Sequence, residues 1–226
     1  MNETKVRLKA SYPLSWQWIS IAWHIQGWLS EAEGNCLFDL ARLRTPACGP
    51  VVVEIGCWQG RSSVLLAAGM REKVNARLFC VDPFGIDESS SYQELYYDEL
   101  IAKMPRTVEE GFLRNIRRCR VADIVHPIKG YSFDVVRSWT EPVDFLFIDA
   151  NHEYESVHRD FTLWSPFVKP DGIVALHDVS ENWPGPVRVM QEELQPPSFR
   201  DLHRVDSLAW AVKEQSKYGI DDNHRR

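Results

Sequence analysis

Hydrophobic and polar residues alternate along most of the chain in the order that an α/β fold requires. From residue 51 onward, short apolar runs with the length of buried strands are followed by segments whose apolar residues recur at helical spacing. We expect strands at 51–55, 77–82, 124–128, 143–149 and 172–177, and helices at 61–70, 107–118, 131–138, 153–165 and 186–195. This order predicts a mostly parallel sheet with helices on both of its faces.

The last part of the chain follows a different pattern. Two apolar stretches, 199–205 and 208–213, are separated only by Asp206 and Ser207. Two residues are too few for a crossover helix, so these strands must form an antiparallel hairpin.

The N-terminal part is rich in tryptophan. Trp16, Trp18, Trp23 and Trp28 lie among aliphatic residues at helical spacing, which predicts a helix across 13–30 with an unusually wide apolar surface. Such a helix either packs on the body of the domain or forms a dimer contact or a wall of the substrate site. A second helix is expected at about 31–44, before Thr45-Pro46.

Length and charge bound the organisation of the chain. Its 226 residues suit one domain with a full core, and the net charge of −6 argues against nucleic acid or an anionic membrane as partner. We expect a helical extension at 1–45, a catalytic domain at 46–215 with an insertion at 85–106, and a polar tail at 216–226. The insertion is acidic and unusually long for a connection, so we interpret it as a lid or substrate wall.

The stretch from Val51 to Ser63 carries the most informative motif. An apolar strand ends near Glu54, turns through Gly56 and Gly60, and enters a helix. This arrangement brings backbone close to a ligand at the carboxyl end of a strand. The two glycines are not clustered as in dinucleotide-binding folds, and a carboxylate beside the turn suits a cationic ligand better than a phosphate. A nicotinamide oxidoreductase is therefore the weaker alternative.

This E-x-G-x-x-x-G pattern resembles the first motif of class I S-adenosylmethionine-dependent methyltransferases. The resemblance is strengthened by Asp82, which ends the second expected strand where such folds bind the ribose hydroxyls. It implies a Rossmann-like, seven-stranded sheet with a C-terminal antiparallel hairpin. It also implies the following cofactor-binding residues: Glu54, Gly56, Cys57, Trp58, Gly60, Ser62, Ser63, Asp82, Pro83, Ser132 and Asp149. The alternative is that Glu54 and Asp82 only cap a helix or a turn.

Polar residues also follow the fourth and fifth expected strands. Asp149 ends one strand and His152 follows it, and His177 ends the next strand and Asp178 follows it. These side chains should converge at the same edge of the sheet, where Asp149, His177 and Asp178 can hold a divalent cation. Oxygen ligands favour Mg²⁺, whereas a histidine ligand favours Mn²⁺ or a softer metal. Such a cation would assist methyl transfer to a weakly nucleophilic hydroxyl, and His152 is the expected general base. In a metal-free alternative, Asp149 faces the cofactor, His177 is a buried hydrogen-bonded histidine and Asp178 caps a turn.

The block I-D-x-x-H-x-Y-E-x-V-x-x-D at 148–160, followed by His177-Asp178, resembles the macrolide-sugar O-methyltransferases. That family implies a metal site at Asp149 and at the pair 177–178, with His152 as base, although the acidic pair of the family is His-Asp here.

We therefore expect an S-adenosylmethionine-dependent O-methyltransferase that acts on a small hydroxylated molecule such as a sugar or secondary metabolite. A binding or assembly component that keeps the cofactor pocket without turnover is the alternative. A homo-oligomer through the tryptophan-rich helix is also expected.

Five scattered cysteines without a C-x-x-C pair indicate a reducing compartment. With no signal-peptide or membrane-spanning pattern, they favour a cytoplasmic protein.

Overall fold

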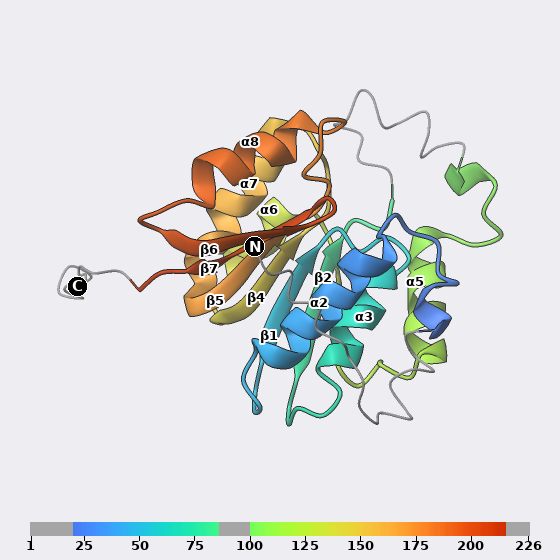
Figure 1. The fold of residues 1–226 in the computed structure, drawn as a ribbon. Coiled ribbons are helices and arrows are strands. Elements are labelled where there is room, and N and C mark those ends of the chain that lie inside the picture. The colour runs from blue at the N-terminus through green and yellow to red at the C-terminus, as the bar shows by residue number, and fades with distance from the viewer. Residues whose placement is uncertain (1–19, 86–99, 216–226) are drawn as a thin grey trace.

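The computed structural model describes residues 20–85 and 100–215. Its centre is a seven-stranded sheet with the strand order β3-β2-β1-β4-β5-β7-β6 (Figure 1). The strands are β1 (Val51–Ile55), β2 (Arg77–Asp82), β3 (Val125–Lys129), β4 (Val143–Ile148), β5 (Val168–Leu176), β6 (Phe199–Val205) and β7 (Leu208–Lys213). The first five are parallel, whereas β7 is antiparallel to both β5 and β6. The predicted mixed sheet with a terminal hairpin is confirmed.

Helices cover both faces of the sheet (Figure 1). One face carries α2 (Glu31–Leu43), α3 (Arg61–Gly69) and α5 (Val108–Arg118), and the other carries α6 (Ser132–Val135), α7 (Tyr154–Trp164) and α8 (Pro184–Glu193). Each face has its own apolar core, because the central strands β1 and β4 are buried on both sides. This is typical of a parallel sheet.

The order of the strands determines where a ligand can bind. The chain moves outward from β1 through β2 to β3, then returns to β4 on the other side of β1. The loops after β1 and β4 therefore diverge to opposite faces, and they leave a crevice at the carboxyl edge of the sheet. In open α/β sheets this reversal point is the usual ligand site.

The predicted tryptophan-rich helix is wrong in its C-terminal part. Residues 1–19 lie outside the described residues, helical structure ends at Ala22, and residues 26–30 have no regular structure. The carbonyl oxygens of Ile25 and Leu29 accept hydrogen bonds from the Arg61 guanidinium, at 2.8 and 3.2 Å. Together with Gly27, a poor helix former, these bonds explain why the helical spacing does not give a helix here.

Two other expectations are refined by the structure. β5 begins at Val168, earlier than the expected strand at 172–177, and Asp171 has a φ of +64° in the part where the pairing with β4 is irregular. Most of the expected lid, residues 86–99, and the polar tail from residue 216 lie outside the described residues. The predicted domain boundaries remain predictions.

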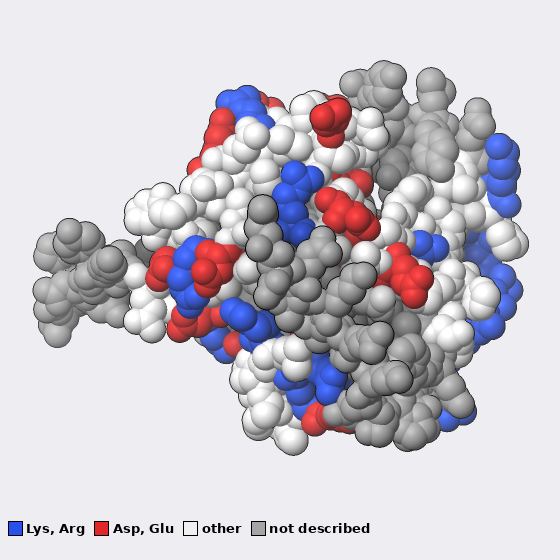
Figure 2. All heavy atoms as spheres, viewed as in Figure 1, with Lys and Arg blue, Asp and Glu red and all other residues white. Residues whose placement is uncertain are grey.

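Among the described residues, no helix has the length and apolar character needed to cross a membrane. On the face shown in Figure 2, Lys and Arg side chains gather along the right-hand edge, where α5 lies, and charges of both signs mix elsewhere.

Candidate active site

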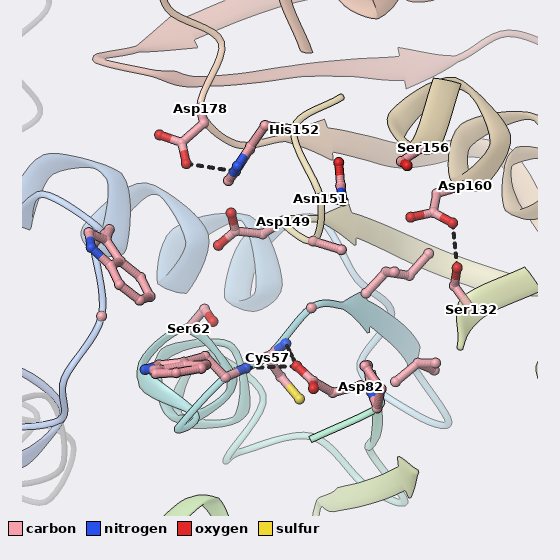
Figure 3. A pocket seen from close by; sticks show the side chains of 18 of the residues that line it. Cys57, Ser62, Asp82, Ser132, Asp149, Asn151, His152, Ser156, Asp160 and Asp178 are labelled. Carbon is pink, nitrogen blue, oxygen red and sulfur yellow. Dashed lines mark hydrogen bonds and ion pairs between the residues drawn. The ribbon is translucent and has the colours of Figure 1, made fainter. Parts of the chain in front are cut away.

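A cavity of about 450 Å³ lies at the carboxyl edge of the sheet. It is lined by ten of the residues predicted for the cofactor, base and metal sites: Gly56, Cys57, Trp58, Ser62, Asp82, Pro83, Ser132, Asp149, His152 and Asp178. Figure 3 shows Cys57, Asp82, Asp149 and Asp178, which come from the ends of different strands, around this cavity. A volume of this size is in the range of small-molecule and cofactor sites.

The turn after β1 forms the floor of this cavity. Gly56 has a φ of +81°, and a Cβ atom at this position would lie 2.4 Å from the carbonyl oxygen of Asp149. Only glycine allows the β1 turn and the end of β4 to approach so closely. Gly60, with a φ of +87°, then starts α3, and a Cβ there would lie 3.0 Å from the ring of Phe112.

Asp82 holds this turn in place. Its Oδ2 accepts hydrogen bonds from the backbone N–H groups of Cys57 and Trp58, at 2.8 and 2.9 Å, and its Oδ1 accepts one from Phe84 at 2.6 Å. Burial raises the pKa of Asp82, and the three backbone hydrogen bonds oppose this rise. The carboxylate therefore organises the glycine turn as well as lining the cavity where a ribose is expected.

Glu54 and Ser63 lie beneath the turn and do not line the cavity. The Glu54 carboxyl group is fully buried, and its Oε2 accepts hydrogen bonds from the Ser63 hydroxyl at 2.5 Å and the Cys80 thiol at 3.2 Å. Burial raises the pKa of Glu54 to about 7. The structure thus places Glu54 where it supports the turn from below.

The opposite part of the cavity contains Ser132 at the start of α6. Its hydroxyl donates a hydrogen bond to Asp160, which projects from α7 and is 4% exposed (Figure 3). Asp160 also lines the cavity. It belongs to the sequence block that resembles the macrolide-sugar enzymes, but the resemblance did not suggest a role for it.

Asp149, His152 and Asp178 come together on the upper side of the cavity (Figure 3). Each offers one ligand atom, and these atoms lie within 4.8 Å of one another. The distance from Nε2 of His152 to Oδ2 of Asp178 is 2.9 Å. Hydrogen bonding to His152 and His177 outweighs burial and lowers the pKa of Asp178.

His177 does not join this group in the cavity. It is 3% exposed and lies behind the two aspartates, with Nδ1 2.9 Å from Oδ1 of Asp149 and Nε2 3.3 Å from Oε2 of Glu33. Burial alone would lower the pKa of His177, but the neighbouring carboxylates outweigh it and raise the value to about 12. His152 therefore stands with the aspartates where the sequence suggested His177.

Several cavity residues were missed by the sequence analysis. Trp183, at the N-terminal end of α8, lies against His152 with ring centroids 4.5 Å apart. The ring centroids of Trp28 and Trp58 are 5.6 Å apart, and Gln26 accepts a hydrogen bond from the Trp58 indole. Trp28 was interpreted as part of a helix, and only its place in a tryptophan-rich segment hinted at a substrate wall.

The reversal of strand order, the glycine turn and the acidic strand end define a class of protein, the class I methyltransferases, whose cofactor occupies such a crevice. A comparison with protein families agrees. A family model described as a methyltransferase domain matches residues 53–179, more than half of the chain, so the protein belongs to this family. The predicted family is confirmed.

Solved structures share the fold. The O-methyltransferase TomG from Streptomyces achromogenes, crystallised with S-adenosylmethionine, superposes with a TM-score of 0.63 at 18% identity, over 92% of this chain and 93% of that one. The O-methyltransferase from Bacillus cereus, in complex with S-adenosylhomocysteine, gives a TM-score of 0.61 at 18% identity, over 92% and 94%. A relative in sequence is the uncharacterized protein R132 of Acanthamoeba polyphaga mimivirus, 27% identical over 135 residues. These cover 57% of this chain, and the match spans about half, 51%, of that relative's length.

Proposed function

We propose that the protein transfers a methyl group from S-adenosylmethionine to a hydroxyl group of a small molecule. The observation that carries this proposal is the meeting of Asp149, His152 and Asp178 on the cavity whose floor is the glycine turn. An imidazole and two carboxylates beside a methyl-donor site are suited to activating a hydroxyl. The cofactors of the two O-methyltransferase structures support the same donor here.

In this proposal, the cofactor lies across the floor of the cavity. Its ribose contacts Asp82, and its adenine lies toward Ser132 and Asp160. The carboxylate of Asp82 accepts three hydrogen bonds from the backbone. Each carboxylate oxygen has two lone pairs, so Asp82 is able to accept a further hydrogen bond from the ribose. The turn residues Gly56 and Cys57 then lie against the rest of the nucleoside and the methionine part.

His152 is the proposed general base. The acceptor oxygen attacks the methyl carbon, the carbon–sulfur bond breaks with its electrons going to sulfur, and the hydroxyl proton passes to the imidazole of His152. Asp178 stabilises the resulting imidazolium, because its carboxylate lies 2.9 Å from the ring nitrogen. The ring of Trp183 packs against the imidazole, with ring centroids 4.5 Å apart, and so limits its rotation.

The same three side chains fit a divalent cation. Two carboxylate oxygens and one imidazole nitrogen within 4.8 Å of one another suit Mn²⁺ better than Mg²⁺. A bound cation would supply electrostatic stabilisation for the developing alkoxide. A nitrogen of His152 that binds a cation is unable to accept a proton. The effect of a chelator on turnover therefore distinguishes His152 as a metal ligand from His152 as the base.

The acceptor is proposed to be a ring-bearing molecule, such as a sugar or an aromatic secondary metabolite. Three tryptophans, Trp28, Trp58 and Trp183, line the cavity, and Trp28 is 44% exposed. Indole faces provide large apolar contact area for the flat or CH-rich face of a ring. These indole rings in the cavity, with Trp183 packed against His152, favour such an acceptor over a flexible chain.

A reducing, cytoplasmic location is part of the proposal. All five cysteines lie in the described residues, and none of them forms a disulfide bond. Burial raises the pKa of Cys57 and Cys80, which keeps their thiols protonated and unreactive.

Incubation with methyl-labelled S-adenosylmethionine and a panel of glycosides and phenols tests the function, with and without a chelator and added Mn²⁺. We expect His152→Ala to lower turnover about 10²- to 10⁴-fold. His158→Ala is the matched control, since His158 lies on the outer part of α7 and pairs with Glu193. Full turnover by the His152→Ala protein would exclude His152 as the base.

A further inference from the structure

A buried carboxylate from α2 lies behind the proposed active site. Glu33 is 2% exposed, and its Oε1 accepts hydrogen bonds from the backbone N–H of Ser207 at 2.8 Å and from the Ser207 hydroxyl at 2.6 Å. Its Oε2 accepts one from the backbone N–H of Ser30 at 2.7 Å and lies 3.3 Å from Nε2 of His177. The bond to Ser30 belongs to a capping box, which a solvent-exposed glutamate performs equally well. Capping therefore does not account for the burial of this charge.

The partner of Glu33 lies between carboxylates. Nδ1 of His177 is 2.9 Å from Oδ1 of Asp149 and 3.4 Å from Oδ2 of Asp178, whereas Nε2 is directed toward Glu33. Both ring nitrogens of His177 therefore face carboxyl groups, which fix the orientation of the ring from two sides. Without Glu33, the Nε2 side of the buried ring would lose its carboxyl partner. A continuous row of contacts thus runs from Glu33 through His177 to Asp149 and Asp178.

The row reaches His152 as its last member. Asp178 contacts His177 with the same Oδ2 that lies 2.9 Å from Nε2 of His152. Rotation of the His177 ring would therefore change where this oxygen points. Partners that orient functional groups in this way commonly affect function without touching the substrate.

We propose that Glu33 is a positioning residue of the active site, which acts through His177 to hold the carboxylates of Asp149 and Asp178 toward the cavity and toward His152. This inference rests on the proposed function of these three residues. It makes α2 part of the active site, although α2 precedes the matched methyltransferase segment, which begins at residue 53. The role does not depend on the acceptor, so it can be tested before the acceptor is identified.

The test uses the full chain with Glu33→Gln, which keeps the shape of the side chain and an oxygen for Ser207 but removes the charge beside His177. Two readouts are measured: the ring signals of His152 and His177 in ¹H–¹⁵N NMR spectra at constant pH, and the Kd for Mn²⁺. We expect Glu33→Gln to shift the ring signals of both histidines and to weaken Mn²⁺ binding by about 10- to 100-fold.

Ser30→Ala is the matched control. It removes the hydroxyl that caps α2 and that donates to Asp206 at 2.6 Å, but Ser30 does not contact His177. This variant should lose stability while its histidine ring signals and Mn²⁺ affinity stay as in the wild type. If a folded Glu33→Gln protein also keeps the wild-type signals and affinity, Glu33 is only a structural residue.

A milder variant covers the case in which Glu33→Gln does not fold. Ser207→Ala removes one of the hydrogen bonds to Oε1 of Glu33, and it should shift the same ring signals in the same direction by a smaller amount. Unchanged signals in that variant would also overturn the proposal.

Failure of the proposed function is recognised separately. A wild-type protein without affinity for S-adenosylhomocysteine would refute the cofactor assignment, and one without affinity for Mn²⁺ would refute metal assistance, while the ring signals still decide the role of Glu33.

Discussion

Replacement of Asp82 by asparagine should destabilise the protein strongly, because this carboxylate accepts three backbone hydrogen bonds in a site that is 9% exposed. An asparagine oxygen can keep the two bonds from Cys57 and Trp58, but its NH₂ group would face the N–H of Phe84. One charge-assisted bond is then lost, which costs about 1.5–3 kcal/mol, and the other two become neutral and weaker by about 1 kcal/mol each. Relief from burying a charge offsets part of this loss. The expected net decrease in the free energy of unfolding is about 2–4 kcal/mol.

Thermal unfolding followed by circular dichroism measures this change. For a chain of this size, each kcal/mol lowers the Tm by roughly 2–4 °C, so the expected decrease is about 4–16 °C. Asp123→Asn is the matched control, because the ion pair of Asp123 with Arg71 is exposed and contributes at most about 1 kcal/mol. If the Asp82→Asn protein unfolds at the same temperature as the control, the three hydrogen bonds do not hold the glycine turn and the reasoning is refuted.

Further predictions concern the turn and the buried carboxyl groups. Gly56→Ala should lower the free energy of unfolding by about 2–4 kcal/mol and abolish binding of S-adenosylhomocysteine, because the added Cβ meets the backbone of Asp149. In the control Gly49→Ala, the residue has a φ of +66° and an added Cβ has nothing within 4 Å. This variant should lose only about 1 kcal/mol in the same denaturation assay. The pKa of Glu33 is lowered from 4.5 to about 2, since hydrogen bonds from His177, Ser207 and Ser30 outweigh burial, so its stabilisation is complete above about pH 4.5 and is lost as the pH falls toward 2. The pKa of His177 is raised from 6.5 to about 12, so its stabilisation is complete below about pH 6.5 and declines as the pH rises. Urea denaturation should therefore give the largest contribution of this pair between about pH 4.5 and 6.5, and a Glu33→Gln variant with an unchanged acid limb would contradict this. Burial raises the pKa of Glu54 from 4.5 to about 7, so the protein loses stability as the pH rises through that interval. Glu54→Gln should flatten this part of the curve of unfolding free energy against pH. A variant whose curve between pH 4.5 and 7 matches the wild type would show that Glu54 does not titrate there.

The sheet was predictable from the sequence because its strands carry a strong local signal. Apart from one acidic residue in each, β1 and β4 are apolar, as expected for strands buried on both faces. The two-residue connection at Asp206 and Ser207 allows only a hairpin. The positions at which the expected strands end are enough to predict which edge of the sheet carries the site. Consequently Asp82 and Asp149 were expected at the cofactor, and Asp149 and Asp178 at a cation; all three line the cavity.

The parts that were not predictable depend on contacts between segments distant in the sequence. The tryptophan-rich segment has helical spacing, but Arg61, more than thirty residues later, binds its carbonyl groups in a non-helical conformation. His177 lies behind the cavity, where its Nε2 is 3.3 Å from Oε2 of Glu33, a residue 144 positions earlier in the chain. The pattern Ser30-x-x-Glu33 indicates a capping box, but no local pattern reveals that the same glutamate continues to a histidine at a strand end.

The most direct test of the central claim is equilibrium dialysis of the purified, folded protein against labelled S-adenosylhomocysteine, with the Gly56→Ala protein alongside. We expect saturable binding of one molecule per chain to the wild type and its loss in the variant, because the cofactor needs the close approach of the β1 turn to the end of β4. A folded wild-type protein that binds none of the compound, or a Gly56→Ala protein that binds it equally well, would contradict the account.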